Sequence, residues 1–154
     1  MVLATMDERI KEHLKRLNMY HQRLRNAQDA SYEVFVSDDV LLSSSERYLH
    51  LAIESCINVG NRLLSLYQFQ KPVRSPETYA DIFRELRLLG VVDAAFRDRL
   101  IQMAKFRNRL VHLYWELESE QVYRFIQEDL GDFRGFQDDV VNFLNANPIS
   151  DPST

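Results

Sequence analysis

An arginine, a histidine and a tyrosine stand close together in one short stretch of the chain. Residues 107–114 read RNRLVHLY, so Arg107 precedes His112 by five positions and Tyr114 follows His112 by two. Arginine carries a permanent positive charge and a planar set of donors that suits phosphate oxygens. Histidine exchanges protons readily near neutral pH. If both groups reach one phosphate, these two residue types suffice to cleave RNA without a metal ion.

One ideal helix does not aim Arg107 and His112 at the same point, because residues five apart are separated by roughly 140° of rotation. Arg107 falls in an apolar row with Leu100, Met103 and Leu110. A cation without a partner is expensive to bury there, so we expect Arg107 to lie at a cleft or an interface. A long arginine that bends around its helix would complete the site. A second copy in a homodimer would also complete it, and we favour this because it explains the charge in an apolar row.

Other polar residues surround this pair. His112 shares a helix face with Asn108, one turn earlier, whose amide can fix the histidine tautomer by hydrogen bonding. Lys105 and Arg109 are expected to contact flanking RNA phosphates. Between positions 97 and 109 a single acid, Asp98, stands against five basic residues: Arg97, Arg99, Lys105, Arg107 and Arg109. From charge alone, an ordinary solvated helix face explains this stretch equally well.

The bulk composition predicts one all-α domain. The chain has 154 residues, of which 45% are hydrophobic, and it contains only four glycines and four prolines. We expect an antiparallel bundle of about five helices over residues 1–146, followed by a flexible tail over residues 147–154. The net charge of −4 excludes the global basic field of a bulk nucleic-acid binder, so any RNA contact must be local.

Several absences in the sequence narrow the possible classes of protein. Cys56 is the single cysteine, which excludes an intrachain disulfide and favours a reducing cytoplasm. The first eight residues lack the basic head and long apolar run of a secretory signal. No apolar run approaches the roughly 20 residues that span a bilayer. No glycine-rich phosphate loop is found, so we exclude a P-loop or Rossmann nucleotide site and expect no cofactor.

Apolar periodicity predicts five helices and one connector. The helices span about residues 5–30, 39–70, 75–90, 93–114 and 118–146. Thr5 is the expected N-cap of the first helix, and Ser75 with Pro76 is the expected start of the third. Residues 31–39 hold a short β-like run without an evident partner, which we interpret as a connector.

Small residues indicate where helices approach closely or bend. In the second helix, Ala52, Cys56 and Gly60 lie on one stripe that would admit another helix. Cys56 is accordingly expected to be a packed core thiol. Gly131 and Gly135 are expected to bend the last helix.

A second group of polar residues could also do chemistry. Glu46, His50 and Glu54 are spaced by four and share one helix face. A divalent-metal site is one interpretation, but we favour a solvated, mutually hydrogen-bonded face. The row could also pair with the motif arginine near a cleft. His13 and His21 are expected at the surface.

Three segments of the chain carry a family likeness. Residues 107–114 match the pattern R-N-x-x-x-H-x-Y, residues 46–60 read ERYLHLAIESCINVG, and residues 79–86 read YADIFREL. In this order they resemble the motif, second helix and third helix of the HEPN superfamily, in its HepT-like toxin branch. The resemblance covers roughly residues 6–145. It implies an antiparallel helical bundle that forms a homodimer, with both motif copies lining a cleft.

The resemblance also implies an activity and partners. It implies a metal-independent endoribonuclease toxin whose catalytic residues are Arg107 and His112, with Asn108 as the supporting polar residue. It implies that a partner antitoxin, a minimal nucleotidyltransferase of the MntA type, modifies Tyr114 with AMP, although a core aromatic is the other interpretation of Tyr114. A rival hypothesis is a non-catalytic helical module for a nucleotidyltransferase, in which Arg107 and His112 recognise a phosphate without breaking a bond.

Overall fold

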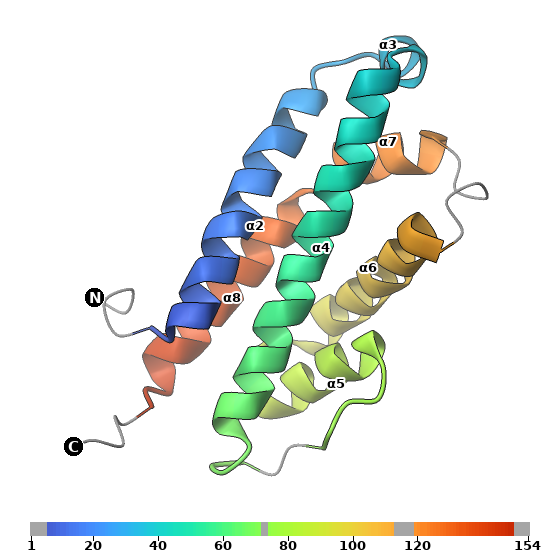
Figure 1. The fold of residues 1–154 in the computed structure, drawn as a ribbon. Helices are drawn as coiled ribbons and strands as arrows, with labels where there is room; N and C mark the ends of the chain where they lie inside the picture. The colour runs from blue at the N-terminus through green and yellow to red at the C-terminus, as the bar shows by residue number, and fades with distance from the viewer. Residues whose placement is uncertain (1–5, 72–73, 113–118, 150–154) are drawn as a thin grey trace.

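The computed structural model describes residues 6–71, 74–112 and 119–149. Every regular element in these ranges is an α-helix, which confirms the predicted all-α class. The described residues form seven helices where about five were expected for the chain, and Figure 1 shows their arrangement. They are α2 (Glu8–Ala27), α3 (Tyr32–Ser37), α4 (Asp39–Tyr67), α5 (Tyr79–Leu89), α6 (Ala94–His112), α7 (Ser119–Glu128) and α8 (Gly131–Ala146).

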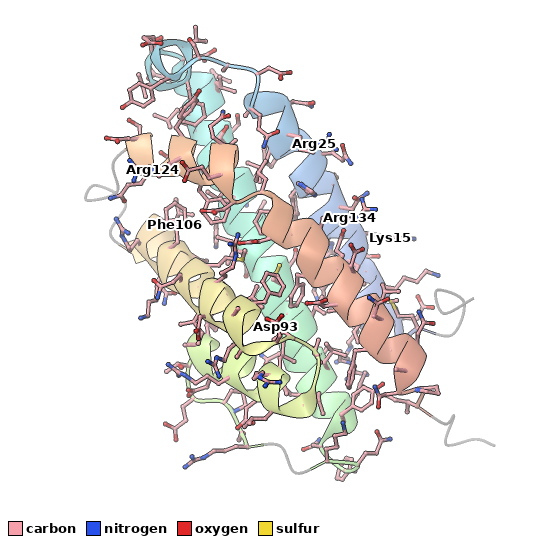
Figure 2. All side chains as sticks on the ribbon, turned by 180° about the vertical axis from the view of Figure 1, so that it is seen from behind. Lys15, Arg25, Asp93, Phe106, Arg124 and Arg134 are labelled. Atoms are coloured by element: carbon pink, nitrogen blue, oxygen red, sulfur yellow. The ribbon has the colours of Figure 1, made fainter. Side chains whose placement is uncertain are left out.

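Two long antiparallel helices, α2 and α4, form the most extensive helix–helix contact of the bundle (Figure 1). Helix α8 lies behind this pair in the view of Figure 1 and in front of it in Figure 2. Helix α5 packs on the C-terminal part of α4 near Gly60, and α6 packs on both α4 and α5. The first helix begins at Glu8 because the Asp7 carboxylate accepts hydrogen bonds from the backbone N–H groups of Arg9 and Ile10. The prediction of Thr5 as its N-cap is therefore wrong, and Thr5 itself lies outside the described residues.

The expected connector after the first helix contains a helix of its own. Residues Tyr32–Ser37 form α3, which begins where the Ser31 hydroxyl accepts a hydrogen bond from the Val34 N–H. Phe35 on this short helix is fully buried. A capped turn anchored by a buried aromatic thus overrides the β propensity of the run, because tertiary packing outweighs local preference.

The third helix starts four residues later than predicted. The Thr78 hydroxyl accepts from the Asp81 N–H at 3.1 Å, and the Asp81 carboxylate accepts from the Thr78 N–H at 3.2 Å. This capping box satisfies two free donors at once. Helix α5 therefore begins at Tyr79 and not at Ser75 with Pro76.

The expected last helix is divided in two. Helix α7 ends at Glu128, and α8 begins at Gly131. The predicted bend near Gly131 is thus confirmed as a break, although a Cβ at Gly131 would meet nothing within 4 Å, so the break does not need a glycine for space. Leu130, buried at 3% exposure, turns the chain into the core at this point.

The small-residue stripe of α4 does bring helices together. A Cβ added at Gly60 would lie 2.6 Å from Cγ2 of Ile82 and 3.2 Å from Cδ1 of Leu86, both on α5. Cys56 is a fully buried core residue, as predicted, and burial raises the pKa of its thiol. None of the helices in the described ranges is long and apolar enough to cross a membrane.

The expected surface position of His21 is wrong. Its exposed fraction is 8%, and its ring lies 6.1 Å from that of Phe133 on α8. His21 occupies a position in the buried row of α2 that includes Leu14, Leu17 and Leu24, so one member of this otherwise apolar row is titratable. Burial lowers the pKa of its imidazole, with added repulsion from Arg25 and Arg134.

Candidate functional site

Helix α6 carries the motif and begins where the sequence predicted. The Asp93 carboxylate accepts a hydrogen bond from the Phe96 N–H at 2.7 Å and so caps the first turn. Leu100 and Met103 are buried and anchor the helix to the core. His112 is the last residue of α6. The side chain of His112 and the whole of Tyr114 lie outside the described residues.

Arg107 is half-buried on the side of α6 that faces α4 and α5. Its guanidinium carbon lies 5.1 Å from the ring centroid of Tyr79, the first residue of α5. Its Nη1 donates to Oδ1 of Asn108 at 3.4 Å, which is long for a hydrogen bond. Its Nε is buried and has no hydrogen-bond partner in the described part of the molecule. The cation is therefore held mainly by an aromatic ring.

The polar row of α4 lies close to Arg107. Glu46, His50 and Glu54 are each half-buried, because the row is partly covered where α6 packs on α4. The favoured prediction of a solvated row with mutual contacts is therefore met in part, since Glu54 pairs with His50. Burial and the charge of Arg107 lower the pKa of His50. Burial also raises the pKa of the Glu46 carboxyl.

The acids of this row do not neutralise the motif arginine. Oε2 of Glu54 lies 3.4 Å from Nε2 of His50, so this carboxylate is directed at the imidazole. No ion pair between the row and Arg107 is found among the described residues. Within the same residues, no group of three or more His, Cys, Asp and Glu side chains is placed to hold a metal ion.

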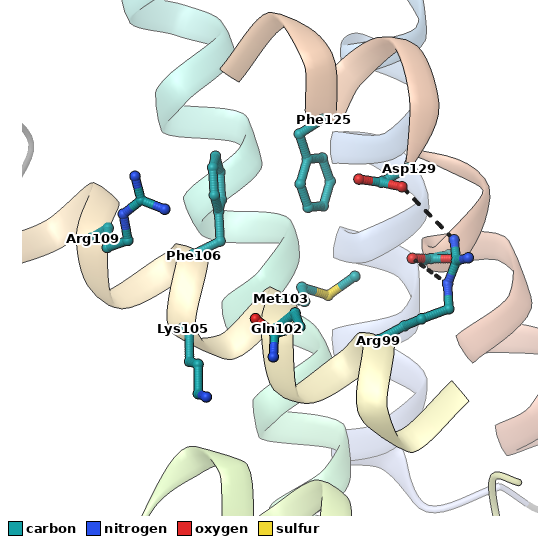
Figure 3. A pocket seen from close by; sticks show the side chains of 9 residues that line it. Arg99, Gln102, Met103, Lys105, Phe106, Arg109, Phe125 and Asp129 are labelled. Atoms are coloured by element: carbon teal, nitrogen blue, oxygen red, sulfur yellow. Dashed lines mark hydrogen bonds and ion pairs between the residues drawn. The ribbon is translucent and has the colours of Figure 1, made fainter. Parts of the chain in front are cut away.

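Lys105 and Arg109 lie on a different side of α6. They line an open groove of about 340 Å³ between α6 and α7 (Figure 3). Phe106 and Phe125 stack in this groove with ring centroids 5.2 Å apart, and Figure 2 shows Phe106 between the two helices. Arg109 donates a hydrogen bond to Oε1 of Gln121 on α7. The two residues expected to bind flanking phosphates therefore share one groove, and Arg107 does not line it.

The remaining two basic residues of the stretch are paired with acids. Arg97 contacts Asp98 at 3.0 Å. Arg99 donates to Asp132 from Nη2 at 2.6 Å and from Nε at 3.1 Å. Its Nη2 also lies 3.8 Å from the Asp129 carboxylate, at the end of the groove seen in Figure 3. Of the five basic residues, Lys105, Arg107 and Arg109 are those without a carboxylate partner in the described ranges.

Sequence reasoning allowed that the polar row containing His50 could lie near Arg107, and the structure places His50 within reach of its charge. It did not identify Tyr79 as a neighbour of Arg107, although Tyr79 was noticed within a family-like segment. Periodicity relates residues on one helix, and these three lie on three different helices. The signal available was indirect, because a cation in an apolar row needs some partner from a neighbouring element.

Comparisons with known proteins identify the family and the fold. A family model described as ribonuclease HepT-like matches residues 8–140. The mRNA nuclease HepT of Shewanella oneidensis is 30% identical over 104 residues, which are 68% of this chain and 75% of that protein. The whole stretch from α2 to most of α8 is therefore matched as one unit.

Solved structures share the fold. One of tri-AMPylated Shewanella oneidensis HEPN toxin in complex with MNT antitoxin has a TM-score of 0.77 at 24% identity and covers 92% of this chain and 100% of that one. A toxin–antitoxin structure with AMP-PNP has a TM-score of 0.75 at 24% identity, covering 88% of this chain and 99% of that one. A cytosolic protein of unknown function from Bacillus subtilis has a TM-score of 0.71 at 24% identity, covering 90% and 94%.

Proposed function

This chain belongs to the HepT-like ribonuclease family, and on that premise we propose that it is an endoribonuclease toxin that cleaves RNA with Arg107 and His112. The observation that carries the proposal is the state of Arg107. Its guanidinium is half-buried and has no carboxylate partner in the described part of the chain. Uncompensated charge is expensive inside a protein, so an anionic ligand is the natural counter-charge. Phosphate oxygens suit the arginine donors in geometry and in charge.

The proposed reaction uses the 2′-hydroxyl of the substrate as the nucleophile. His112 accepts the proton of this hydroxyl, and the oxygen then attacks the adjacent phosphorus. The bond from phosphorus to the 5′-oxygen breaks, and a second proton donor protonates the leaving oxygen. Arg107 holds the phosphate and stabilises the negative charge that builds on its oxygens. Because these two groups supply both proton transfer and charge stabilisation, we propose that the reaction is metal-independent.

We propose that the active form is a homodimer. Arg107 and the pair formed by Lys105 and Arg109 lie on different sides of α6. Two copies of α6 related by a two-fold axis can present one side of each helix to the same strand. In that arrangement the histidine of the second copy is the proton donor. Lys105 and Arg109 contact flanking phosphates, which adds affinity without sequence choice.

Neutralisation by a nucleotidyltransferase antitoxin of the MntA type is part of the proposal. One structural relative is a tri-AMPylated HEPN toxin in complex with an MNT antitoxin, and it shares the fold of this chain. We propose that the antitoxin transfers AMP to Tyr114, two positions after His112. The adduct adds bulk and negative charge beside the catalytic residue, so it repels an RNA phosphate. Asn108 keeps the proposed supporting role of orienting the histidine.

Cleavage of a short single-stranded RNA by the purified chain tests the activity. We expect cleavage in the presence of EDTA, with 2′,3′-cyclic phosphate ends, and no cleavage of the same sequence with 2′-deoxy sugars. His112→Ala and Arg107→Ala should each abolish cleavage while the circular dichroism melt stays unchanged. RNA binding without cleavage by the unmodified protein would instead identify a non-catalytic binding module.

Co-expression with a nucleotidyltransferase of the MntA type tests the neutralisation. The expected product carries the mass of AMP on Tyr114 and no longer cleaves RNA. Tyr114→Phe should remain toxic and escape neutralisation, because the acceptor hydroxyl is missing. If Tyr114→Phe were neutralised as well as the unchanged chain, modification of Tyr114 would not be the mechanism.

A further inference from the structure

The ring of Tyr79 is the principal contact of the Arg107 guanidinium. The guanidinium carbon lies 5.1 Å from the ring centroid, within the range of a cation–π interaction. The other polar contact is the 3.4 Å approach to Asn108, the next residue on the same helix. Nε has no partner in the described ranges. Removing the ring would therefore leave this cation with little that fixes its position.

The local structure holds Tyr79 in place. Tyr79 is the first residue of α5, directly after the N-cap Thr78. The capping box between Thr78 and Asp81 satisfies the first turn, and Asp81 also accepts from Arg84 at 2.7 Å. Although 38% of Tyr79 is exposed, its backbone is fixed by this turn. No hydrogen bond of the phenol oxygen is found within the described residues, so the ring and not the hydroxyl makes the contact.

An aromatic support has a different electrostatic consequence from an acidic one. Arg99, about two turns earlier on the same helix, is held by two carboxylates, which balance its charge. An aromatic face attracts a cation through its quadrupole and carries no formal charge. Arg107 is thus held in position while its full positive charge remains available. The carboxylate of Glu54, which is close by on α4, is directed at His50 instead.

We propose, on the basis of the ribonuclease function proposed above, that Tyr79 is a positioning residue that holds Arg107 by its ring and leaves the arginine charge free for the scissile phosphate. Tyr79 does not touch the reacting atoms in this proposal. It restricts the guanidinium to one orientation, so that the donors meet the phosphate as charge develops on it. Its loss should therefore lower kcat more than it raises KM, because positioning matters most in the transition state.

Substitutions that separate the ring from the hydroxyl test this role. Tyr79→Phe keeps the ring, and we expect kcat for RNA cleavage within about twofold of the unchanged chain. Tyr79→Leu keeps an apolar side chain without a π face, and we expect kcat to fall about 10- to 100-fold. Tyr32→Leu is the matched control, since Tyr32 is 39% exposed and contacts Tyr123 instead of an arginine. We expect the control to change kcat less than twofold.

A double-mutant cycle distinguishes positioning from a structural role. In the Arg107→Gln background, Tyr79→Leu should have no further effect on residual cleavage, because the group it positions is absent. An equal loss in both backgrounds would overturn the proposal, and so would an equal loss in Tyr79→Phe and Tyr79→Leu. Thermal melts of each variant identify any general loss of folding.

A readout independent of cleavage separates this inference from the proposed function. The side-chain Nε–Hε signal of Arg107 in NMR spectra should be shifted by the ring current in the unchanged chain and in Tyr79→Phe. It should move toward the position of a free arginine in Tyr79→Leu. If the signal behaves in this way in a protein that cleaves no RNA, the ribonuclease function fails and the ring contact stands. An unchanged signal in Tyr79→Leu overturns the proposal even in an active enzyme.

Discussion

The two halves of α6 use arginine in opposite ways. In the first half, Arg97 and Arg99 contact acids at 3.0 Å and 2.6 Å. In the second half, Lys105, Arg107 and Arg109 contact an aromatic ring, amide oxygens or solvent, and no ion pair includes them in the described ranges. Charge in the first half is neutralised within the molecule. Charge in the second half, where the motif lies, has no acidic partner in the described ranges.

This contrast divides the basic stretch of residues 97–109 into two parts that the sequence alone did not distinguish. Arg99 joins α6 to the junction of α7 and α8 through Asp129 and Asp132, so its function is structural. What matters for a phosphate is the number of cations without internal partners at the site, and not the net charge of the chain.

The largest expected effect comes from Arg107→Gln. RNA cleavage should fall about 100- to 1000-fold, because a charged donor to the transition state is removed. Stability should not fall, since Arg107 forms no ion pair in the described ranges and its buried Nε is unsatisfied. Initial cleavage rates and a thermal melt of the same preparation measure both quantities. A large drop in Tm would show that Arg107 is a structural cation like Arg99.

Arg99→Gln should show the reverse pattern. We expect a loss of about 1 kcal/mol in the free energy of unfolding, because a two-nitrogen contact to Asp132 is removed. Cleavage measured well below the Tm should change less than about twofold. Arg97→Gln is the matched control, since its pair with the adjacent and exposed Asp98 should contribute little. Urea denaturation measures the difference, and equal stability of the two variants would contradict the structural role of Arg99.

Lys105→Gln and Arg109→Gln should have a smaller effect that depends on salt. Each removes one proposed phosphate contact, so the slope of log affinity for single-stranded RNA against log salt should decrease in size by about 0.7. Binding is measured in the His112→Ala background to prevent cleavage. Arg99→Gln should leave the slope unchanged. A slope that responds equally to all three substitutions would show that the two halves of α6 do not differ toward RNA.

The smallest expected effect is on the titration of His50. Burial and the charge of Arg107 lower its pKa, with opposing attraction from Glu54 and further repulsion from Arg47 on its own helix. A lowered pKa means that the native state binds fewer protons than the unfolded state just below pH 6.5, so stability decreases as the pH falls through this range.

Histidine NMR signals followed against pH measure this effect. Arg107→Gln should raise the pKa of His50, and Arg99→Gln should leave it unchanged. An unchanged pKa in Arg107→Gln would show that Arg107 does not act on the polar row of α4. His21 is the internal reference, since its lowered pKa has other causes, namely burial and repulsion from Arg25 and Arg134.

Local sequence signals predicted much of the fold, and they failed where two signals competed. The all-α class, the start of α6 at Asp93 and the close approach at Gly60 follow from patterns within a few residues. The start of α5 was misplaced because Ser75 with Pro76 resembles a helix start as much as Thr78 with Asp81 does. Only the completed capping box shows which start is used.

Features that depend on contacts between distant segments could not be predicted from local sequence patterns. The short helix α3 depends on burial of Phe35, and the buried position of His21 depends on Phe133 from α8. For the candidate site, the sequence placed Arg107 in an apolar row and so predicted a partner from another element. It did not identify that partner as Tyr79, because no spacing rule relates positions 79 and 107.

The order of residues along α6 determined that a cation and an amide are adjacent on one helix and that an imidazole follows about one turn later, since helical periodicity depends only on chain geometry. The tertiary structure decided which of the five basic residues have a carboxylate partner that balances their charge. Helix α5 supplies an aromatic ring to Arg107, whereas the α7–α8 junction supplies carboxylates to Arg99. Electrostatic neutralisation requires atoms within a few ångströms, and only packing brings residues from distant parts of the chain that close.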